Sequence, residues 1–346
     1  MPRFSLISFF ILGFLIVQSV SCLGPSSSVI RIEGSSTLYP LSVAVTEEYI
    51  RSHGDARIAI GFSGTGGGIR KFIQGEIEIT DASRPITPEE KRLASQSGVQ
   101  FTELPVAYDG IVVAVNAANT WCEALSVSEL KRIWDLESQN RLNLWSQIRP
   151  EWPEERIYLF GPGANSGTVH YFSRAVIGDA QGIRGDFSSS EDDNLTALSL
   201  RNNPLGMGFF GYSYYQKNRD SLKLVAIDDE NPSNGAGPVK PGVQTIMDGT
   251  YQPLSRPLFL YVWANSPEGR GLDEFLEFYL DNVPWLANEV GLVPLPPDLH
   301  VLVVDRLRRG ITGSMFSNRA DRYRSSVAAL LKQDVQESGK RNDSAD

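Results

Sequence analysis

Short runs of β-branched and apolar residues alternate along the chain with stretches whose apolar residues recur at helical spacing. Residues 29–33 predict a strand, and Leu41, Val45, Tyr49 and Ile50 then predict the apolar face of a helix. The same order of strand, polar turn and helix is expected after three further strands, at 57–60, 77–79 and 156–160. This alternation is typical of an α/β fold with a parallel sheet and helices on its faces.

The polar turns at 61–68, 80–85 and 161–168 connect these strands to their helices. Apolar runs predict more strands at 111–115, 206–212 and 257–263, the last buried on both faces. Further helices are expected at 128–134, with Ser128 as N-cap, and at 273–280. Residues 323–331 can form one short helix, and 333–346 are polar and predicted to be disordered.

The N-terminus has the pattern of an export signal. Arg3 precedes an apolar run over 4–17, which is too short to span a bilayer, and small residues then lead to Cys22. We therefore expect a signal peptide at 1–21, a lipid on Cys22 and a flexible tether at 22–28. The alternative is ordinary signal cleavage that leaves Cys22 free. The only other cysteine in the sequence is Cys122, and two cysteines make no disulfide framework or zinc site.

Composition and charge narrow the possible functions. A chain of 346 residues with 41% hydrophobic and 21% charged residues is globular and long enough for two domains. Its net charge of -9 and pI near 5.0 argue against nucleic acid as a partner, because phosphate backbones are bound through clustered Lys and Arg. Any anion site must therefore work through short, directed hydrogen bonds.

Small hydroxyl and glycine residues gather where the predicted strands give way to helices. A helix N-terminus offers unpaired backbone N–H groups and partial positive charge, and glycine lets the backbone approach a ligand closely. In a single turn, Ser and Thr are ordinary helix caps. Three such turns together, beyond the carboxyl ends of strands, indicate a site for a tetrahedral oxyanion. The candidate residues are Ser35, Ser36, Thr37, Ser63, Thr65, Gly68, Ser166, Gly167 and Thr168.

Three charged residues near these turns bear on the same hypothesis. Arg84 is the one cation inside a candidate turn, and its fork of donors suits phosphate oxygens, although a surface role is the alternative. Phosphate at neutral pH still carries a proton, so a buried carboxylate that accepts it would exclude fully ionised sulfate. Asp81 and Asp109 are candidates for this acceptor, and spacing does not choose between them.

Other chemistries lack their signatures. The glycines at 61–68 have neither a Gly-Lys-Ser/Thr sequence nor dinucleotide spacing, and the three histidines occur singly, so neither nucleotide nor metal is expected. Ser166 and His170 share one predicted helix and allow an exported phosphatase or esterase as an alternative, but no Gly-x-Ser-x-Gly elbow accompanies them. No cofactor is expected.

At its turns the sequence resembles the phosphate-binding proteins that feed high-affinity phosphate ABC transporters, which have the type II periplasmic binding fold. The resemblance covers about 29–316 and lies in GSSTLYP at 34–40, GTGGGI at 64–69, DASRPI at 81–86, NSGT at 165–168, SEDDN at 190–194 and DGTYQPLSRPL at 248–258. It implies two α/β lobes with the ligand between them: lobe 1 at 29–106 and 260–317, lobe 2 at 107–259, and a tail at 318–346.

Carried over by position, the resemblance implies phosphate contacts from the first, glycine, third and Ser-Gly-Thr turns. The residues are Ser36, Thr37 with the amide of Leu38, Ser63, Thr65, Ser83, Arg84, Ser166, Gly167 and Thr168. Two positions depart from better-known members: Ser83 stands where they have an Asp that accepts the phosphate proton, and Pro162 where they have an Arg. Arg84 can replace that cation.

The expected function is capture of inorganic phosphate outside the cytoplasm, in the periplasm or at the outer face of the membrane, and delivery to the membrane permease subunits of an ABC transporter. The protein is expected to be a monomer. The alternatives are a binder of molybdate, tungstate or sulfate, the exported phosphatase, and a surface sensor or adhesion module that uses its C-terminal tail.

Overall fold

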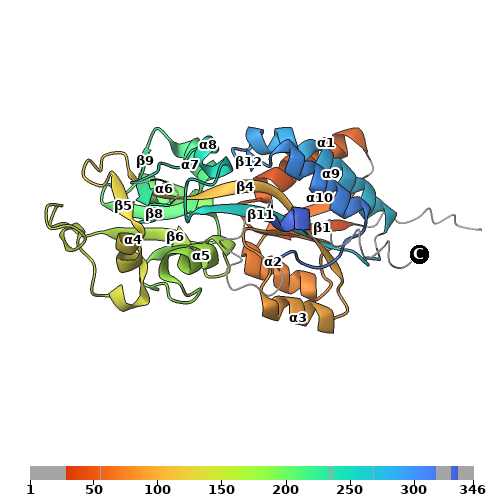
Figure 1. Ribbon diagram of the computed structural model, residues 1–346, viewed down its shortest axis with the longest axis horizontal. Coiled ribbons are helices and arrows are strands. Elements are labelled where there is room, and N and C mark those ends of the chain that lie inside the picture. The colour runs from red at the N-terminus through yellow and green to blue at the C-terminus, as the bar shows by residue number, and fades with distance from the viewer. Residues whose placement is uncertain are drawn as a thin grey trace, which may run out of the picture.

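The structure is a computed structural model that describes residues 29–316, except 55, 234, 236 and 268, together with residues 329–333. The predicted leader, the tether and Cys22 lie outside the described residues, as does most of the tail. Two halves lie side by side, and two long strands, β4 (Phe101–Asn116) and β11 (Ser255–Trp263), run across both (Figure 1). None of the helices in the described part of the chain is long and apolar enough to cross a membrane.

One curled mixed sheet runs through both halves in the order β2-β1-β3-β11-β4-β8-β6-β7. Strand β4 pairs with β11 from Phe101 to Gly110 and with β8 from Ile111 to Val115, so it is shared by both halves. The remaining strands are β1 (Ile30–Gly34), β2 (Ile58–Phe62), β3 (Ile79–Ala82), β5 (Ala124–Ser126), β6 (Tyr158–Pro162), β7 (Ser188–Ser190), β8 (Gly206–Gly211), β9 (Leu222–Leu224), β10 (Ala226–Asp228) and β12 (Val293–Pro294).

Within each half the outer strands are parallel. Strand β1 lies between β2 and β3, and β6 lies between β7 and β8. Parallel neighbours need crossover connections, and helices provide several of them. Across the shared sheet β6 runs opposite to β1 and β3, so the carboxyl ends of the strands in the two halves face each other where the halves meet.

Helices cover the sheet in both halves (Figure 1). They are α1 (Tyr39–Ser52), α2 (Gly64–Ile73), α3 (Pro88–Gln96), α4 (Val127–Trp134), α5 (Gly167–Phe172), α6 (Asp193–Arg201), α7 (Tyr212–Asn218), α8 (Val243–Met247), α9 (Arg270–Glu289) and α10 (Pro297–Arg308). A π-helical turn over Ser173–Ile177 extends α5. Helix α3 begins with a capping box in which Thr87 and Glu90 satisfy each other's backbone N–H groups.

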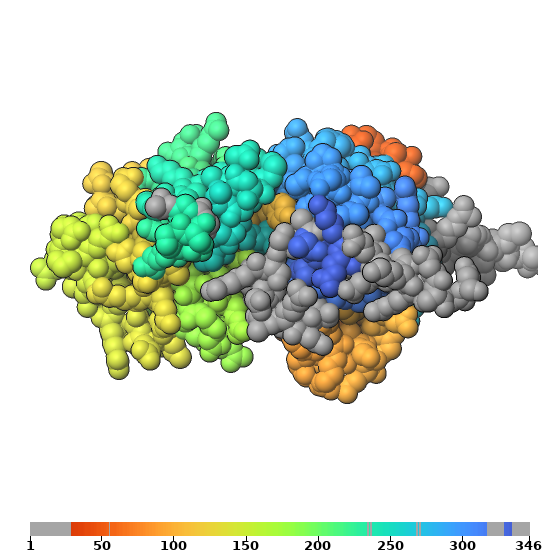
Figure 2. Space-filling view, in the orientation of Figure 1, coloured from red at the N-terminus to blue at the C-terminus, as the bar shows by residue number. Residues whose placement is uncertain are grey.

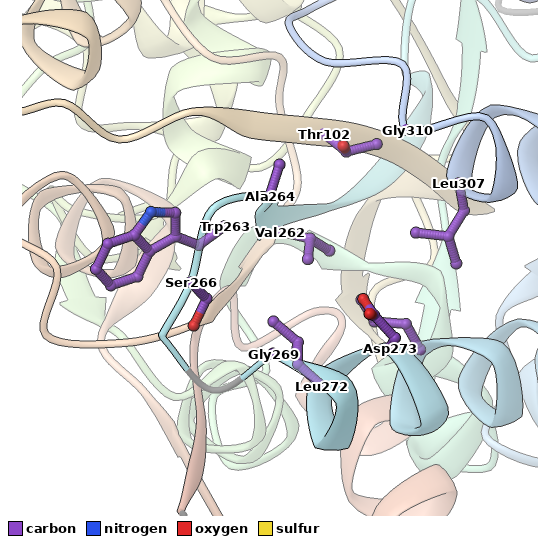
Figure 3. A pocket seen from close by; sticks show the side chains of 11 residues that line it. Thr102, Val262, Trp263, Ala264, Ser266, Gly269, Leu272, Asp273, Leu307 and Gly310 are labelled. Carbon is purple, nitrogen blue, oxygen red and sulfur yellow. The ribbon is translucent and has the colours of Figure 1, made fainter.

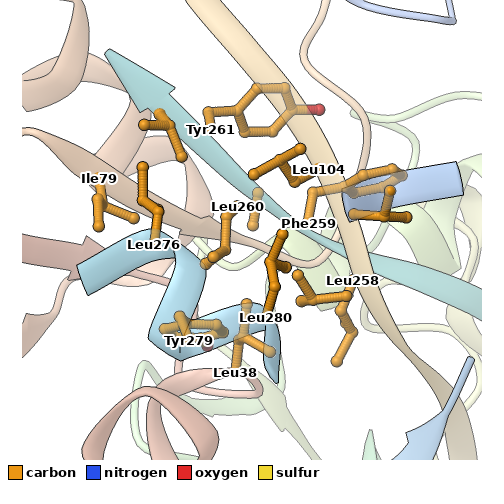
Figure 4. Close-up of a cluster of buried hydrophobic side chains, with 14 of the residues drawn as sticks. Leu38, Ile79, Leu104, Leu258, Phe259, Leu260, Tyr261, Leu276, Tyr279 and Leu280 are labelled. Atoms are coloured by element: carbon orange, nitrogen blue, oxygen red, sulfur yellow. The ribbon is translucent and has the colours of Figure 1, made fainter. Parts of the chain in front are cut away.

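Two separate clusters of buried hydrophobic side chains define the halves. The first, drawn in part in Figure 4, packs α1, α2 and α9 against β1, β3 and β11, and we call the half around it lobe 1. The second surrounds Trp134, Phe172 and Phe209, and we call that half lobe 2. In the space-filling view the two lobes meet across the middle of the molecule (Figure 2). The helix over 329–333 adds Leu330 and Leu331 to the first cluster.

Several local predictions are wrong at their boundaries. The cap of α4 is Ser126, which accepts from the Glu129 N–H, while Ser128 lies inside the first turn. Ile50 is 39% exposed, because it lies at the edge of the face that buries Leu41 and Val45.

The turns predicted at 61–68 and 80–85 are also shorter than expected. Residues 64–68 already belong to α2, and Thr80–Ala82 belongs to β3. A Cβ added at Gly68 would lie 2.5 Å from the Cα of Gly34, so the absence of a side chain lets the helix pack directly on β1. Close packing of this kind outweighs the low helix propensity of glycine.

Candidate functional site

Four buried hydroxyl groups from four different turns meet between the lobes. They belong to Thr37 after β1, Thr65 at the start of α2, Ser83 after β3 and Thr168 at the start of α5, all with no exposed surface. The Oγ1 atoms of Thr37 and Thr168 are 3.4 Å apart, and Thr65 Oγ1 lies 3.2 Å from Ser83 Oγ. Segments separated by up to 131 residues therefore share one small polar centre.

The two lobes are in direct contact around this centre. A Cβ on Gly167 of lobe 2 would lie 2.4 Å from the hydroxyl oxygens of both Thr65 and Ser83 of lobe 1. Beside it, the Gly66 N–H donates to the carbonyl of Asn165 at 2.9 Å. Arg70 of α2 donates to the Asn165 side chain at 3.1 Å. The arrangement is a closed one, in which the backbone at 165–167 lies against the start of α2.

Local sequence explains why the hydroxyls stand at these points. Ser166 is the N-cap of α5, and its hydroxyl accepts from the Thr168 N–H at 3.1 Å. Ser63 precedes α2 without making a side-chain cap. Leu38 is fully buried in the core of lobe 1 and anchors the first turn (Figure 4).

A cation that the sequence did not single out lies at the centre of the site. Arg256 of β11 is 1% exposed, and its Nη2 donates to Thr37 Oγ1 at 3.2 Å and to Thr168 Oγ1 at 2.9 Å. Its Nη1 donates to the Ser83 carbonyl at 3.2 Å. Asp109 of β4 accepts from the same guanidinium at 2.8 Å. Arg256 therefore contacts three of the four turns, and the Asp109 carboxylate balances its charge.

Arg84, the cation expected from sequence, has different neighbours. Its guanidinium donates to both carboxylate oxygens of Glu90, at 2.7 and 2.8 Å, within lobe 1. Its Nε donates to Nδ1 of His170 in lobe 2 at 3.3 Å, which adds a further contact between the lobes. Burial and the nearby Arg84 charge lower the pKa of His170 to about 4. A ligand role for Arg84 stays a prediction.

The carboxylates near the site are held in different ways. Asp81 accepts twice from Ser42, at 2.9 and 3.0 Å, and burial raises its pKa to about 7. Asp109 accepts from the Tyr212 N–H at 3.1 Å in addition to Arg256. Burial raises the pKa of Asp109, and the Arg256 charge opposes that rise. Asp193, at the start of α6, accepts from Ser36 Oγ across the lobes at 3.3 Å.

A hollow elsewhere in the described part of the chain has a different lining. A hollow in lobe 1 lies between the end of β11, the start of α9 and the end of α10 (Figure 3). Its lining is largely apolar, includes Asp273 and contains no Lys or Arg. Among the residues that the structure describes, no group of His, Cys, Asp and Glu side chains is arranged to hold a metal ion.

Comparison with known proteins agrees with the fold. A family model described as the PBP superfamily domain matches residues 23–283. Protein SphX of Synechocystis sp. is 39% identical over 88% of this chain and 90% of its own. The phosphate-binding protein PstS of Staphylococcus epidermidis is 35% identical over 84% of this chain and 86% of its own. A crystal structure of a possible phosphate-binding protein from Planctomyces limnophilus is 37% identical, with a TM-score of 0.62, over 82% of this chain and 99% of that one.

The chain thus has the two-lobed fold of a periplasmic-type binding protein. It belongs to the PBP superfamily and, within it, to the family that contains PstS and SphX.

Proposed function

We propose that this protein captures inorganic phosphate between its lobes and delivers it to the permease subunits of an ABC transporter. The observation that carries the proposal is the meeting of Arg256 with the hydroxyls of Thr37 and Thr168 in a buried centre. The relatives named phosphate-binding proteins support the same ligand. A phosphate oxyanion would replace the contacts between hydroxyls with hydrogen bonds from each of them.

The proposed ligand groups are mostly neutral donors. They comprise the sequence-derived set of Ser36, Thr37, Leu38, Ser63, Thr65, Ser83, Arg84, Ser166, Gly167 and Thr168, to which we add Arg256. Each hydrogen bond to a charged group contributes about 1.5–3 kcal/mol. A micromolar Kd needs roughly 8 kcal/mol net, so several such bonds suffice after the costs of desolvation and lobe closure.

The lobe boundaries proposed are 29–106 with 260–317, and 107–259. They are supported by the two hydrophobic clusters, which change over within β4, between Ala107 and Ile111, and again just at the start of β11, between Leu254 and Leu258. Opening and closing about these shared strands would admit and enclose the anion. The closed form would then present one surface to the transporter.

We further propose an extracytoplasmic monomer that is exported by a signal peptide and anchored through lipid on Cys22. The N-terminal sequence supports the export and the anchor. We also propose that the protein is not an enzyme. The hydroxyl of Ser166 accepts from the Thr168 N–H and Nδ1 of His170 accepts from Arg84, so both groups of the phosphatase alternative already have other partners.

Calorimetric titration of ligand-stripped protein with phosphate tests the proposal, with sulfate, molybdate and arsenate as competitors. The expected result is one phosphate per chain with a micromolar or lower Kd, and arsenate as the effective competitor. No heat of binding with phosphate, or molybdate binding more tightly than phosphate, would overturn it.

A further inference from the structure

Asp193 is a buried carboxylate that neither the core nor the ion pairs of the protein explain. Its side chain is fully buried, and its Oδ2 atom accepts from Ser36 Oγ at 3.3 Å. Its Oδ1 atom has no hydrogen-bond partner among the described residues. A buried carboxylate oxygen without a partner is costly, so a group that completes its hydrogen bonding is expected.

The position of Asp193 joins it to the site. It comes from lobe 2, whereas its partner Ser36 belongs to the lobe 1 turn that also supplies Thr37. The Tyr214 hydroxyl donates to the carbonyl of Ser36 at 2.6 Å and closes the other side of this turn. The carboxylate therefore lies next to the hydroxyl centre and is held there by contacts between the lobes.

The charged and titratable groups around Asp193 leave its carboxylate without a cation of its own. Arg256 attracts it, but the guanidinium is already bonded to Asp109. Asp109 and the neighbouring Asp192 repel it, and Tyr214 also faces it. Burial, as the leading cause, raises the pKa of Asp193 to about 7. A donor proton would remove the cost of this isolated charge.

The carboxylate oxygens of the other acidic residues at the site are less available to accept a further hydrogen bond. Asp81 is turned toward Ser42 in lobe 1, and Asp109 is occupied by Arg256 and by the Tyr212 N–H. Glu191 also has one oxygen without a partner among the described residues, but its side chain is only partly buried and holds the Asn165 N–H.

We infer that Asp193 accepts the proton of the bound phosphate and thereby excludes oxyanions that carry no proton. This inference rests on the proposed function. Phosphate and arsenate can donate an O–H to Oδ1 and form a charge-assisted hydrogen bond, with Ser36 holding the other oxygen. Sulfate and monofluorophosphate are tetrahedral dianions without a proton, so at the same place they bring only acceptor oxygens against a carboxylate.

The test compares Asp193→Asn with Asp192→Asn. Asp192 is the N-cap of α6, and its Oδ1 atom accepts a hydrogen bond from the Asn194 N–H. Both changes remove one negative charge in adjacent positions, and Asn caps a helix as well as Asp does. Calorimetry at pH 9.0, where the Asp193 carboxyl is ionised and phosphate still carries one proton, measures the Kd of each variant for phosphate, sulfate and monofluorophosphate, and circular dichroism verifies folding.

For the wild type we expect phosphate to bind at least hundredfold more tightly than either proton-free anion. In Asp193→Asn that ratio should fall by about ten- to hundredfold, the value of one hydrogen bond to a charged group. Asp192→Asn should keep the wild-type ratio. If Asp193→Asn does not fold, Asp193→Ser serves instead, because serine is accepted at a helix start.

An unchanged ratio in the folded Asp193 variant, or an equal loss of affinity for all three anions, overturns the inference while phosphate binding itself stands. A fall of the ratio in both variants also overturns it, because a general charge effect would then explain the selectivity. Failure of the wild type to bind phosphate would instead refute the proposed function.

Discussion

Removing the hydroxyl of Thr168 is expected to weaken phosphate binding without unfolding the protein. Thr168 is fully buried, and its Oγ1 atom contacts both Arg256, at 2.9 Å, and Thr37, at 3.4 Å. In Thr168→Ala one donor to the anion is lost, at a cost of about 1.5–3 kcal/mol. Because each 1.4 kcal/mol corresponds to tenfold in Kd, we expect a loss of roughly ten- to hundredfold.

The assay is calorimetric titration of ligand-stripped protein with phosphate, combined with thermal unfolding. Thr46→Ala is the matched control, since Thr46 is likewise buried but belongs to α1 of lobe 1, outside the site. Thr46→Ala should keep the phosphate affinity of the wild type. Equal affinities of Thr168→Ala and wild type would refute the assignment of this hydroxyl, and equal losses in both variants would indicate a general effect on folding.

Three more predictions follow from the contacts. Gly167→Ala should weaken phosphate binding more than tenfold, because its Cβ would lie 2.4 Å from Thr65 Oγ1 and Ser83 Oγ, while Gly185→Ala, whose Cβ would meet only Gln139 Oε1 at 3.6 Å, should bind normally in the same titration. The pKa of His170 lies near 4 instead of 6.5, so folding favours the neutral ring, and stability is retained above pH 6.5 and lost as the pH falls toward 4. Between pH 7 and pH 5 the wild type should therefore lose about 2 kcal/mol more than His170→Gln in urea unfolding, and equal losses would contradict this. Leu331→Ala should reduce the free energy of unfolding by about 2–5 kcal/mol and leave phosphate affinity unchanged, whereas Lys332→Ala, with a 57% exposed side chain, should change neither.

The strand-to-helix turns could be predicted from sequence because their signals are local. β-branched runs, capping residues such as Thr87 and the apolar face of α1 are all readable within one turn of chain. Where glycine is packed directly on a strand, as in α2, tertiary contacts override propensity, and the predicted turn became a helix. The apolar pattern did not predict helices α6, α7, α8 and α10.

Two charged residues at the site, Arg256 and Asp193, could not be found from such local signals. Arg256 and its partner Asp109 are 147 residues apart, and Ser36 and Asp193 are 157 residues apart. No periodicity connects such positions, because the pairing exists only after β4, β11 and the two lobes have assembled. Arg256 did lie inside the motif at 248–258, immediately before the strand predicted at 257–263, and that motif was its only local signal.

Phosphate capture as proposed requires one anion to be bound where the four turns meet. A crystal structure with arsenate in place of phosphate would test this directly through the anomalous signal of arsenic. We predict a single strong peak per chain within hydrogen-bond distance of Thr37, Thr65, Thr168 and Arg256. A peak elsewhere, such as in the lobe 1 hollow beside Asp273, with the hydroxyl centre unoccupied, would contradict the account.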